Sequence, residues 1–140
     1  MGFTYSSSVL PAKNPLYGWE TFGTDHKKIN GVWELPITLT NTPFLNIPFA
    51  GGIYFRNLPK KIIMTYFKKT QKTNNTVIGY FHPYDIDTEQ EYFMHPDINN
   101  NIIFNKLMYR GRNTVLNKLD TIIKTGWKIK TYEKHILSLE

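Results

Sequence analysis

The chain has 140 residues, a formal net charge of +6 and no cysteine. Its length suits a single domain over residues 1–140, and its 41% of apolar residues supply a core, which excludes a disordered chain. The absence of cysteine excludes disulfides, thiolate zinc sites and a cysteine nucleophile. The positive charge would suit an acidic polymer, an anionic membrane surface or nucleic acid, but no basic run is longer than a pair.

The sequence indicates neither membrane insertion nor secretion. No stretch approaches the roughly 18 apolar residues of a membrane-spanning helix, so we expect no membrane span. Residues 1–8 carry neither the basic residues nor the apolar segment of a secretory signal. These observations leave the compartment open.

The first third of the chain is irregular around one predicted strand. Residues 11–31 mix proline and glycine with aromatic and polar residues, which predicts a loop. Residues 32–40 are rich in β-forming side chains and predict a strand, in which Pro36 favours an edge position or a bulge. Residues 42–52 are irregular again, because they contain two prolines and a glycine pair.

A helix and a strand are predicted next. Pro59 suits the first turn of a helix. Four residues form its predicted core-facing stripe: Ile62, Ile63, Tyr66 and Phe67. Residues 76–82 form a short apolar and aromatic run that predicts a buried strand. Residues 83–111 are rich in loop-forming residues, with a surface turn predicted at 99–101.

The last third repeats this order of helix and strand. Asn113 is a good N-cap, and Gly126 suits the C′ position that ends the helix. Four residues form the predicted core-facing stripe: Leu116, Leu119, Ile122 and Ile123. Residues 127–130 predict a short strand, and residues 132–137 a terminal turn or helix. Helix followed by strand, twice, is typical of an α/β fold.

The segment Gly79–Asp87 carries the clearest indication of chemistry. An aromatic run ends there in His82-Pro83 and an acidic turn. Because proline cannot donate to a sheet ladder, the strand should end at His82. This places an imidazole at the carboxyl end of an α/β strand, where such folds gather catalytic residues, and histidine can exchange a proton near neutral pH. The alternative is a histidine that only caps a turn.

Several motifs in a fixed order resemble one known family. They are Gly2–Ser8, Glu34–Ile37, Ala50–Pro59, the His82-Pro83 strand end and Tyr109–Arg112. From Gly2 to about Ile136, the chain resembles the C-terminal half of a NodB-like polysaccharide deacetylase. The branch it resembles is associated with bacterial exopolysaccharide and exosortase gene clusters.

The resemblance implies a fold and an activity. The fold would be α/β, a partial and distorted (β/α) barrel that lacks its N-terminal strands. The activity would be hydrolytic N-deacetylation of an N-acetylated cell-surface or extracellular polysaccharide, in the bacterial cytoplasm or cell envelope. Family members use a divalent metal such as zinc, held by an aspartate and two histidines from early motifs, with a second early aspartate as the base. The metal lowers the pKa of water and polarises the acetyl carbonyl.

The resemblance also assigns residues. His82 matches the late histidine that protonates the departing amine, which makes it the predicted catalytic residue. Tyr54, Arg56 and Tyr84 are the predicted substrate-binding residues, with Tyr54 and Arg56 in a glycine-flanked segment that resembles a groove-lining loop. Aromatic faces stack on sugar rings, and the planar fork of arginine can hold an anionic or hydroxyl-rich ligand. The alternatives are core packing for Tyr54 and hydrogen bonds to loop carbonyls for Arg56.

The chain departs from the family on the metal side. The early aspartate and His-Ser-x-x-His motifs are absent, and the four histidines lack metal-ligand spacing: His26, His82, His95 and His135. Ser6 stands where members often carry an aspartate that orients the acid histidine, and Ile53 replaces a usual third glycine. We therefore expect no metal or other cofactor in this chain alone. Its partners would be a polysaccharide and a separately encoded N-terminal half, because losing part of a catalytic unit removes nearly all activity.

Two other functions compete with this interpretation. The first is a non-catalytic carbohydrate-binding remnant that uses Tyr54, Arg56 and Tyr84. The second is a small basic nucleic-acid-binding domain, which is less favoured because no basic stripe is interleaved with exposed aromatics, so we expect no nucleic-acid partner.

A barrel without its first strands should also expose an apolar face or self-associate.

Overall fold

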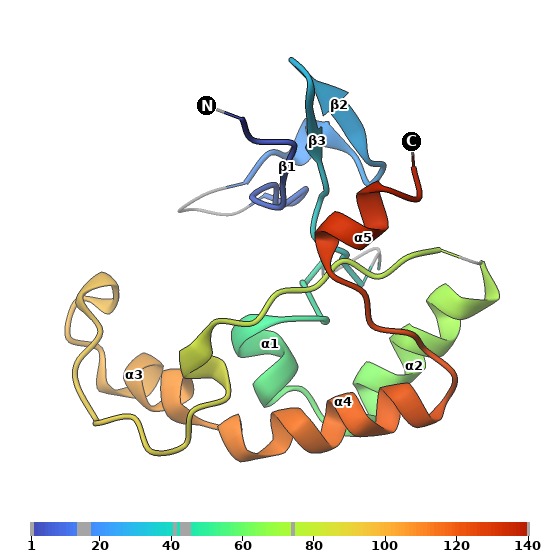
Figure 1. Ribbon diagram of the computed structural model, residues 1–140. Helices are drawn as coiled ribbons and strands as arrows, with labels where there is room; N and C mark the ends of the chain where they lie inside the picture. The colour runs from blue at the N-terminus through green and yellow to red at the C-terminus, as the bar shows by residue number, and fades with distance from the viewer. Residues whose placement is uncertain (1, 14–17, 41, 43–45, 74, 140) are drawn as a thin grey trace.

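The computed structural model describes residues 2–13, 18–40, 42, 46–73 and 75–139. Its helices are α1 (Gly52–Asn57), α2 (Lys60–Lys72), α3 (Ile102–Tyr109), α4 (Val115–Lys124) and α5 (Tyr132–Ile136). The described ranges also contain four short 3-10 helices: η1 (Glu20–Phe22), η2 (Pro83–Asp85), η3 (Pro96–Ile98) and η4 (Arg112–Thr114). The strands are β1 (Tyr5–Ser6), β2 (Lys27–Ile29) and β3 (Val32–Glu34). In Figure 1 the small sheet and α5 lie on one side of the molecule, and α1 to α4 gather on the other.

The three strands form one sheet in the order β1-β3-β2. The first strand, β1, runs parallel to β3, and β2 pairs with β3 as an antiparallel hairpin. The hairpin turn is Asn30-Gly31, with φ of 50° and 83°. Positive φ at both residues is the geometry of the type I′ turn that matches strand twist. This hairpin falls inside the predicted loop over residues 11–31, part of which lies outside the described residues, so that prediction is wrong for residues 27–29.

The main core lies between α1, α2 and α4. Its fully buried side chains include Phe55 from α1, Ile63 from α2 and Val115 from α4, each 0% exposed. The ring of Phe67 packs edge-to-face on those of Phe49 and Trp127, with centroids 5.4 and 5.2 Å apart. A second, smaller cluster joins the sheet region to α5 through Leu35, Ile78 and Ile136.

Glycines bring the extended segment over residues 76–82 against the start of α1. A Cβ at Gly79 would lie 2.2 Å from the Ala50 carbonyl oxygen, and one at Gly51 would lie 2.3 Å from the Tyr80 carbonyl oxygen. The Gly52 N–H donates to the Tyr80 oxygen at 3.1 Å. The two backbones therefore touch directly, which only glycine permits.

The helices α2 and α5 confirm the sequence predictions, and the C′ position of α4 is Gly126 with φ of 96°. The predicted stripe of α2 is partly right, because Ile63 and Phe67 are buried whereas Ile62 is 42% exposed. The prediction for α4 was shifted along the helix. Its buried residues are Val115, Lys118 and Ile122, whereas Leu116 and Ile123 are 62% and 50% exposed. The buried Lys118 explains the shift, since the predicted stripe contained only apolar residues.

Other element predictions are corrected by the structure. Residues 76–82 and 127–130 are extended but form no sheet ladder, and the strand predicted over 32–40 ends at Glu34. The reason is visible at Ile78, whose N–H donates to the Thr38 hydroxyl instead of a backbone carbonyl, at 2.8 Å. A strand exists only with a partner ladder, and among the described residues these segments have none.

Two helix boundaries were also mispredicted. Asn113 lies inside η4 and is not the N-cap of α4. The loop-rich stretch over residues 83–111 contains α3, whose N-cap Asn101 accepts hydrogen bonds from the amides of Ile103 and Phe104. The predicted turn at 99–101 is confirmed, because Asn99 and Asn100 have φ of 47° and 57°.

The described chain is thus a mixed α/β structure with a three-stranded sheet, and a distorted (β/α) barrel stays a prediction. The longest described helix, α2, has 13 residues, and no helix in the described ranges is long and apolar enough to cross a bilayer.

Candidate functional site around His82

His82 stands where the extended segment turns into η2. Its backbone N–H donates to Asp85 Oδ2 at 2.9 Å, and the Asp85 N–H donates to the His82 carbonyl oxygen at 2.9 Å. Between them Pro83 fits the first position of the turn, because it has no N–H to satisfy. This reciprocal pair fixes the backbone of His82 while its side chain stays exposed.

Aromatic rings flank the imidazole. The His82 ring stacks on the Tyr84 ring, with centroids 4.9 Å apart and planes 12° apart. The Tyr80 ring meets it edge-on at 5.6 Å. Tyr84 also meets the His95 ring edge-on, with centroids 6.3 Å apart. The imidazole is therefore oriented by rings from its own segment.

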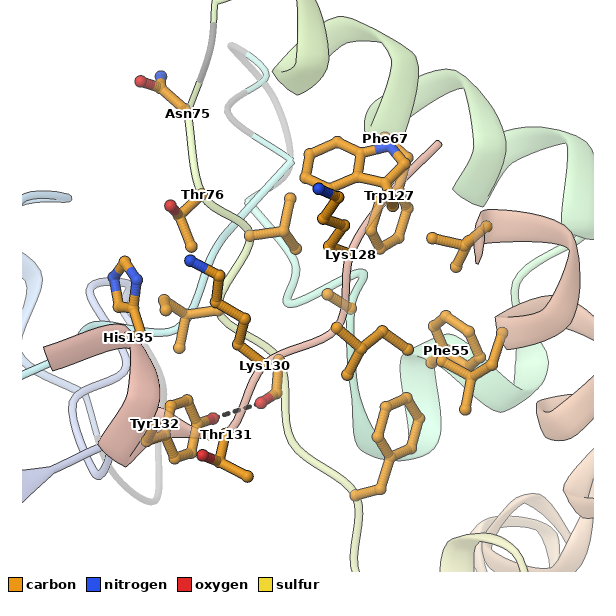
Figure 2. Close-up of a pocket in the computed structure, with 18 of the residues that line it drawn as sticks. Phe55, Phe67, Asn75, Thr76, Trp127, Lys128, Lys130, Thr131, Tyr132 and His135 are labelled. Atoms are coloured by element: carbon orange, nitrogen blue, oxygen red, sulfur yellow. Dashed lines mark hydrogen bonds between the residues drawn. The ribbon is translucent and has the colours of Figure 1, made fainter. Parts of the chain in front are cut away.

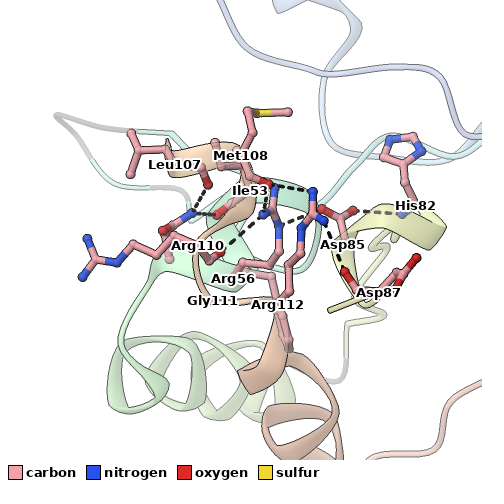
Figure 3. Close-up of polar contacts among 12 residues, drawn as sticks. Ile53, Arg56, His82, Asp85, Asp87, Leu107, Met108, Arg110, Gly111 and Arg112 are labelled. Atoms are coloured by element: carbon pink, nitrogen blue, oxygen red, sulfur yellow. Dashed lines mark hydrogen bonds and ion pairs between the residues drawn. The ribbon is translucent and has the colours of Figure 1, made fainter. Parts of the chain in front are cut away.

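The Asp85 carboxylate is held by a buried ion pair. Arg56 Nε lies 2.8 Å from Asp85 Oδ1, and both side chains are 0% exposed. Arg56 Nη1 donates to the carbonyl oxygens of Met108 at 2.6 Å and Arg110 at 3.3 Å (Figure 3). Burial lowers the pKa of Arg56, and the nearby Asp85 charge opposes that shift. The turn that carries His82 is therefore anchored to α1 and, through α1, to the end of α3.

A second buried arginine holds the next part of the same loop. Arg112 Nη1 donates to the Asp87 carbonyl oxygen at 3.2 Å and to Gln90 Oε1 at 2.9 Å. Its Nη2 donates to the Met108 carbonyl oxygen at 3.1 Å, and its guanidinium lies 4.3 Å from the centre of the Tyr109 ring. Figure 3 shows the two arginines side by side. Together they fasten the loop after His82 to the helical side of the molecule.

Lys118 completes this polar layer from α4. Only 6% exposed, it donates from Nζ to the carbonyl oxygens of Phe55, Arg56 and Leu58 at 2.8, 2.8 and 3.0 Å. These carbonyls belong to the end of α1, where helical oxygens lack partners and a positive charge is favourable. Burial lowers the pKa of Lys118. Its contacts hold the helix that carries Arg56.

The structure brings together only some of the predicted site residues. His82 and Tyr84 are stacked, and Arg56 reaches them through Asp85. Arg56 lies on α1, not on a loop, and its guanidinium is enclosed. It donates to the carbonyl oxygen of Met108 in the last turn of α3 and to that of Arg110 just after it, so of the carbonyls in the structural alternative only that of Arg110 lies outside a helix. Its contact with substrate stays a prediction, and the contacts described for its guanidinium are with Asp85, Met108 and Arg110. Tyr54, also on α1, is 38% exposed and has no contact with His82 among those described.

Sequence reasoning missed three residues of this site. They are Tyr80, Asp85 and Arg112. Asp85 had a usable signal, since a carboxylate three residues after the first residue of a turn is the spacing of a capping box. Arg112 belonged to a recognised motif but had no role assigned. Ser6, where a carboxylate partner for His82 was expected, lies on β1 with its hydroxyl 2.9 Å from that of Ser8, and no described contact joins it to His82.

The described residues do not fit the metal that the resemblance implies. Nowhere in the described ranges do three His, Asp or Glu side chains come together as a ligand set. Asp85 is committed to Arg56 and to the His82 backbone. The arrangement can offer an exposed imidazole for proton transfer, and no group of three metal-ligating side chains lies beside it among the described residues.

Comparison with known proteins places the chain in a family. Residues 7–133 match the family described as a domain of unknown function, DUF3473. The chain belongs to this family. No curated protein and no solved structure matches it. The DUF3473 match includes His82, Asp85 and both buried arginines, so the anchored turn lies inside the family domain.

Proposed function

We propose that this chain supplies the leaving-group side of a polysaccharide N-deacetylase and is inactive alone. The substrate would be an N-acetylated polysaccharide of the cell surface or the extracellular matrix. The observation that carries the proposal is an exposed imidazole on a turn whose carboxylate is held by a fully buried arginine. A turn-capping histidine alone would not require that anchor.

The proposed role of His82 is that of a general acid. When an N-acetyl group is hydrolysed, the bond between the acyl carbon and the amine nitrogen breaks, and that nitrogen must gain a proton to leave as a neutral amine. A protonated imidazole can donate that proton and hold the resulting hydrogen bond. Exposure of His82 allows a polymer to approach, and the rings of Tyr80 and Tyr84 limit where the imidazole can point.

Arg56 and Asp85 act on this step only by position. Neither side chain is exposed, so neither touches a substrate. They hold the His82 backbone at a fixed distance from α1, and a displacement of about 1 Å in a catalytic group can cost about 10²-fold in rate. The base that activates water, and any metal, would come from a separate polypeptide. The residues of this chain would act only on the departing amine.

The test is reconstitution with a second polypeptide that carries the aspartate and two-histidine motifs of a NodB-like deacetylase. Acetate release from an N-acetylhexosamine oligomer should require both polypeptides. His82→Ala should lower turnover by about 10²–10⁴-fold, which is the rate enhancement that general acid–base catalysis usually contributes. His26→Ala is the matched control, because it removes an imidazole outside this site and should leave turnover within about twofold. Unchanged turnover in His82→Ala would contradict the proposal.

The second candidate is a carbohydrate-binding domain without catalysis. The observation that favours it is the stacked pair of His82 and Tyr84, since flat rings also bind sugars. Calorimetric titration with the same oligomer separates the two. Binding that is lost in Tyr84→Ala, with no acetate released in any reconstitution, would support the binding function instead.

A further inference from the structure

Two extended segments border an apolar groove. Figure 2 shows the groove, with residues 76–81 along one wall and residues 127–131 along the other. Its volume is about 550 Å³. Its floor includes Phe55, Phe67 and Ile122, all from the main core. Both walls follow helices, α2 and α4, and both run away from the same end of those helices in Figure 1. The groove is therefore lined like the gap between two strands of a parallel sheet.

The first wall presents one edge of its backbone to the groove. Ile78 uses its N–H and its carbonyl oxygen on Thr38, on the side away from the groove, at 2.8 and 3.0 Å. In an extended chain the polar groups of successive residues point to opposite sides. Those of Val77, Gly79 and Phe81 therefore face the second wall. The Tyr132 hydroxyl confirms this direction, because it donates to the Gly79 carbonyl oxygen across the groove.

These edge groups have few partners. Apart from the Tyr132 contact, the structure describes no hydrogen bond to the backbone of Val77, Gly79 or Phe81. The same holds for the second wall, where the described residues 127–130 make no backbone hydrogen bond. Rows of unpaired N–H and C=O groups on extended chain are templates for another strand. Trp127 on the second wall packs on the main core, whereas Lys128, Ile129 and Lys130 are exposed, Ile129 by 63%.

The charges on the groove are of one sign. Lys128 and Lys130 line it, and among the described residues no aspartate or glutamate does. These lysines stand two residues apart, so they project to the same side of the extended wall. A second copy of this chain would bring the same lysines against each other, which disfavours self-pairing here. A strand that carries carboxylates would instead find opposite charges.

We propose that this groove binds an extended β-strand from a partner polypeptide, with apolar residues facing the floor and carboxylates facing Lys128 and Lys130. The main-chain groups of Val77 and Phe81 and the N–H of Gly79 would pair with the added strand, as in β-augmentation, while the Gly79 carbonyl oxygen keeps its hydrogen bond from Tyr132. The wall over residues 127–131 spans about 17 Å at about 3.3 Å per residue, so about five partner residues would be held. Apolar burial against the floor would add to the hydrogen bonds.

The groove ends next to His82, so a strand bound in it would approach the imidazole. The first wall ends at Phe81, and the next residue is His82. A strand added parallel to this wall would end beside His82, so residues that follow it could face the imidazole. This last point rests on the proposed function, whereas binding of the strand does not.

The probe is a synthetic peptide of about seven residues that alternates glutamate and valine, long enough to span the wall. Nuclear magnetic resonance of the isotope-labelled chain measures amide exchange at Val77, Gly79 and Phe81. We expect these amides to be protected when the peptide is present. A peptide with lysine in place of glutamate should bind at least about tenfold more weakly. A glutamate peptide with N-methylated alternate residues should lose the protection, because it cannot donate to the wall.

Two variants of the chain test the walls. The double variant Lys128→Glu, Lys130→Glu should reverse the preference between the acidic and basic peptides. Lys61→Glu, Lys68→Glu is the matched control, since these lysines are exposed on α2 outside the groove lining, and should keep the preference. Ile129→Pro removes one N–H from the second wall, a group with no partner among the described residues. It should weaken peptide binding while α2 and α4 keep their exchange protection.

Three results would overturn the inference. The first is equal binding by the N-methylated peptide, which would mean that no strand pairing occurs. The second is exchange or shift changes found only at residues that do not line the groove. The third is protection of the same amides by concentration of the chain alone, which would make a second copy the occupant. None of these readouts uses acetate release, so a failed reconstitution and a failed strand-binding test are told apart.

Discussion

At the residue scale, the site depends on a charge that is buried with its partner. Arg56 and Asp85 lie in positions that look ordinary in the sequence, yet both side chains are 0% exposed. The spacing of Asp85 from His82 could have predicted the turn, but not the ion pair, because Arg56 lies far away along the chain. Breaking such a pair leaves one charge buried and uncompensated.

We expect Asp85→Asn to lower the free energy of unfolding by about 3–5 kcal/mol, because the Arg56 charge stays buried without its partner. Urea unfolding midpoints measure this. The matched control is Asp120→Asn, whose carboxylate is 56% exposed and pairs with Lys124 on the surface of α4 at 2.6 Å. Its effect should be at most about 1 kcal/mol. The double variant Arg56→Met, Asp85→Leu should recover most of the lost stability. Equal effects of the two aspartate variants would contradict a buried pair.

A glycine gives the second prediction at this scale. Gly79→Ala would place a Cβ 2.2 Å from the Ala50 carbonyl oxygen, so one of the two backbones must move. We expect a loss of about 1–3 kcal/mol in the free energy of unfolding, as for overpacked sites. Gly2→Ala is the control, since nothing lies within 4 Å of its Cβ position. The displacement should also shift the resonances of His82, which a simple loss of stability at a remote site would not do.

At the scale of elements, the C-terminal helix is tied to the N-terminal hairpin by two histidines. His135 Nε2 on α5 lies 3.4 Å from Nδ1 of His26, the residue before β2. Burial lowers the pKa of His26, and the neighbouring His135 lowers it further, while Asp25 opposes. Burial and Lys130 lower the pKa of His135. Both imidazoles are therefore favoured in the neutral form in the folded state.

The sign of the resulting pH dependence follows from the lowered pKa values. The unfolded chain takes up protons near the ordinary histidine pKa of about 6.5, before the folded chain does. The free energy of unfolding should therefore be highest above that pH, fall as the pH decreases through it, and level off below the folded pKa. Chemical unfolding at pH 7.5 and 5.5 measures the difference. His135→Gln should reduce it, because one of the two shifted groups is gone, and an unchanged difference would contradict this assignment.

The elements also show where prediction from sequence succeeds. Apolar spacing and Gly126 located α2 and the end of α4, because those signals act within a few residues. The two extended segments were correctly predicted as extended but wrongly as paired strands, since pairing depends on residues distant in the chain. The missed hairpin at Asn30-Gly31 had a local signal, as Asn-Gly favours the type I′ turn.

At the scale of the whole molecule, apolar side chains remain on the outside. Leu116 and Ile123 lie on one face of α4 and are 62% and 50% exposed, and on α3 Ile103 is 74% exposed. Monomeric proteins seldom expose large contiguous apolar surfaces, so exposure of this kind favours association. These exposed side chains on α3 and α4 lie outside the groove, because its lining contains none of the three residues.

We expect the chain to bind an apolar fluorescent dye and to associate with increasing concentration. The double variant Leu116→Glu, Ile123→Lys should reduce both effects, because it places charges on that face of α4. Its free energy of unfolding should change by about 0.5 kcal/mol or less, since both side chains are at least half exposed. Analytical ultracentrifugation measures the association. A monomeric parent chain without dye binding would contradict the expectation.

The sequence by itself determined the helices α2 and α5, the extended run before His82 and the tight turn that follows it. These depend on interactions over a few residues: apolar periodicity, a proline without an N–H, and a carboxylate three residues on. Only the tertiary structure decided that Arg56 and Asp85 are buried together and that the segments over residues 76–81 and 127–131 border one groove. A buried ion pair and two backbone segments that border one groove both require residues that folding brings together from distant parts of the chain. Local sequence does not specify which distant residues will meet.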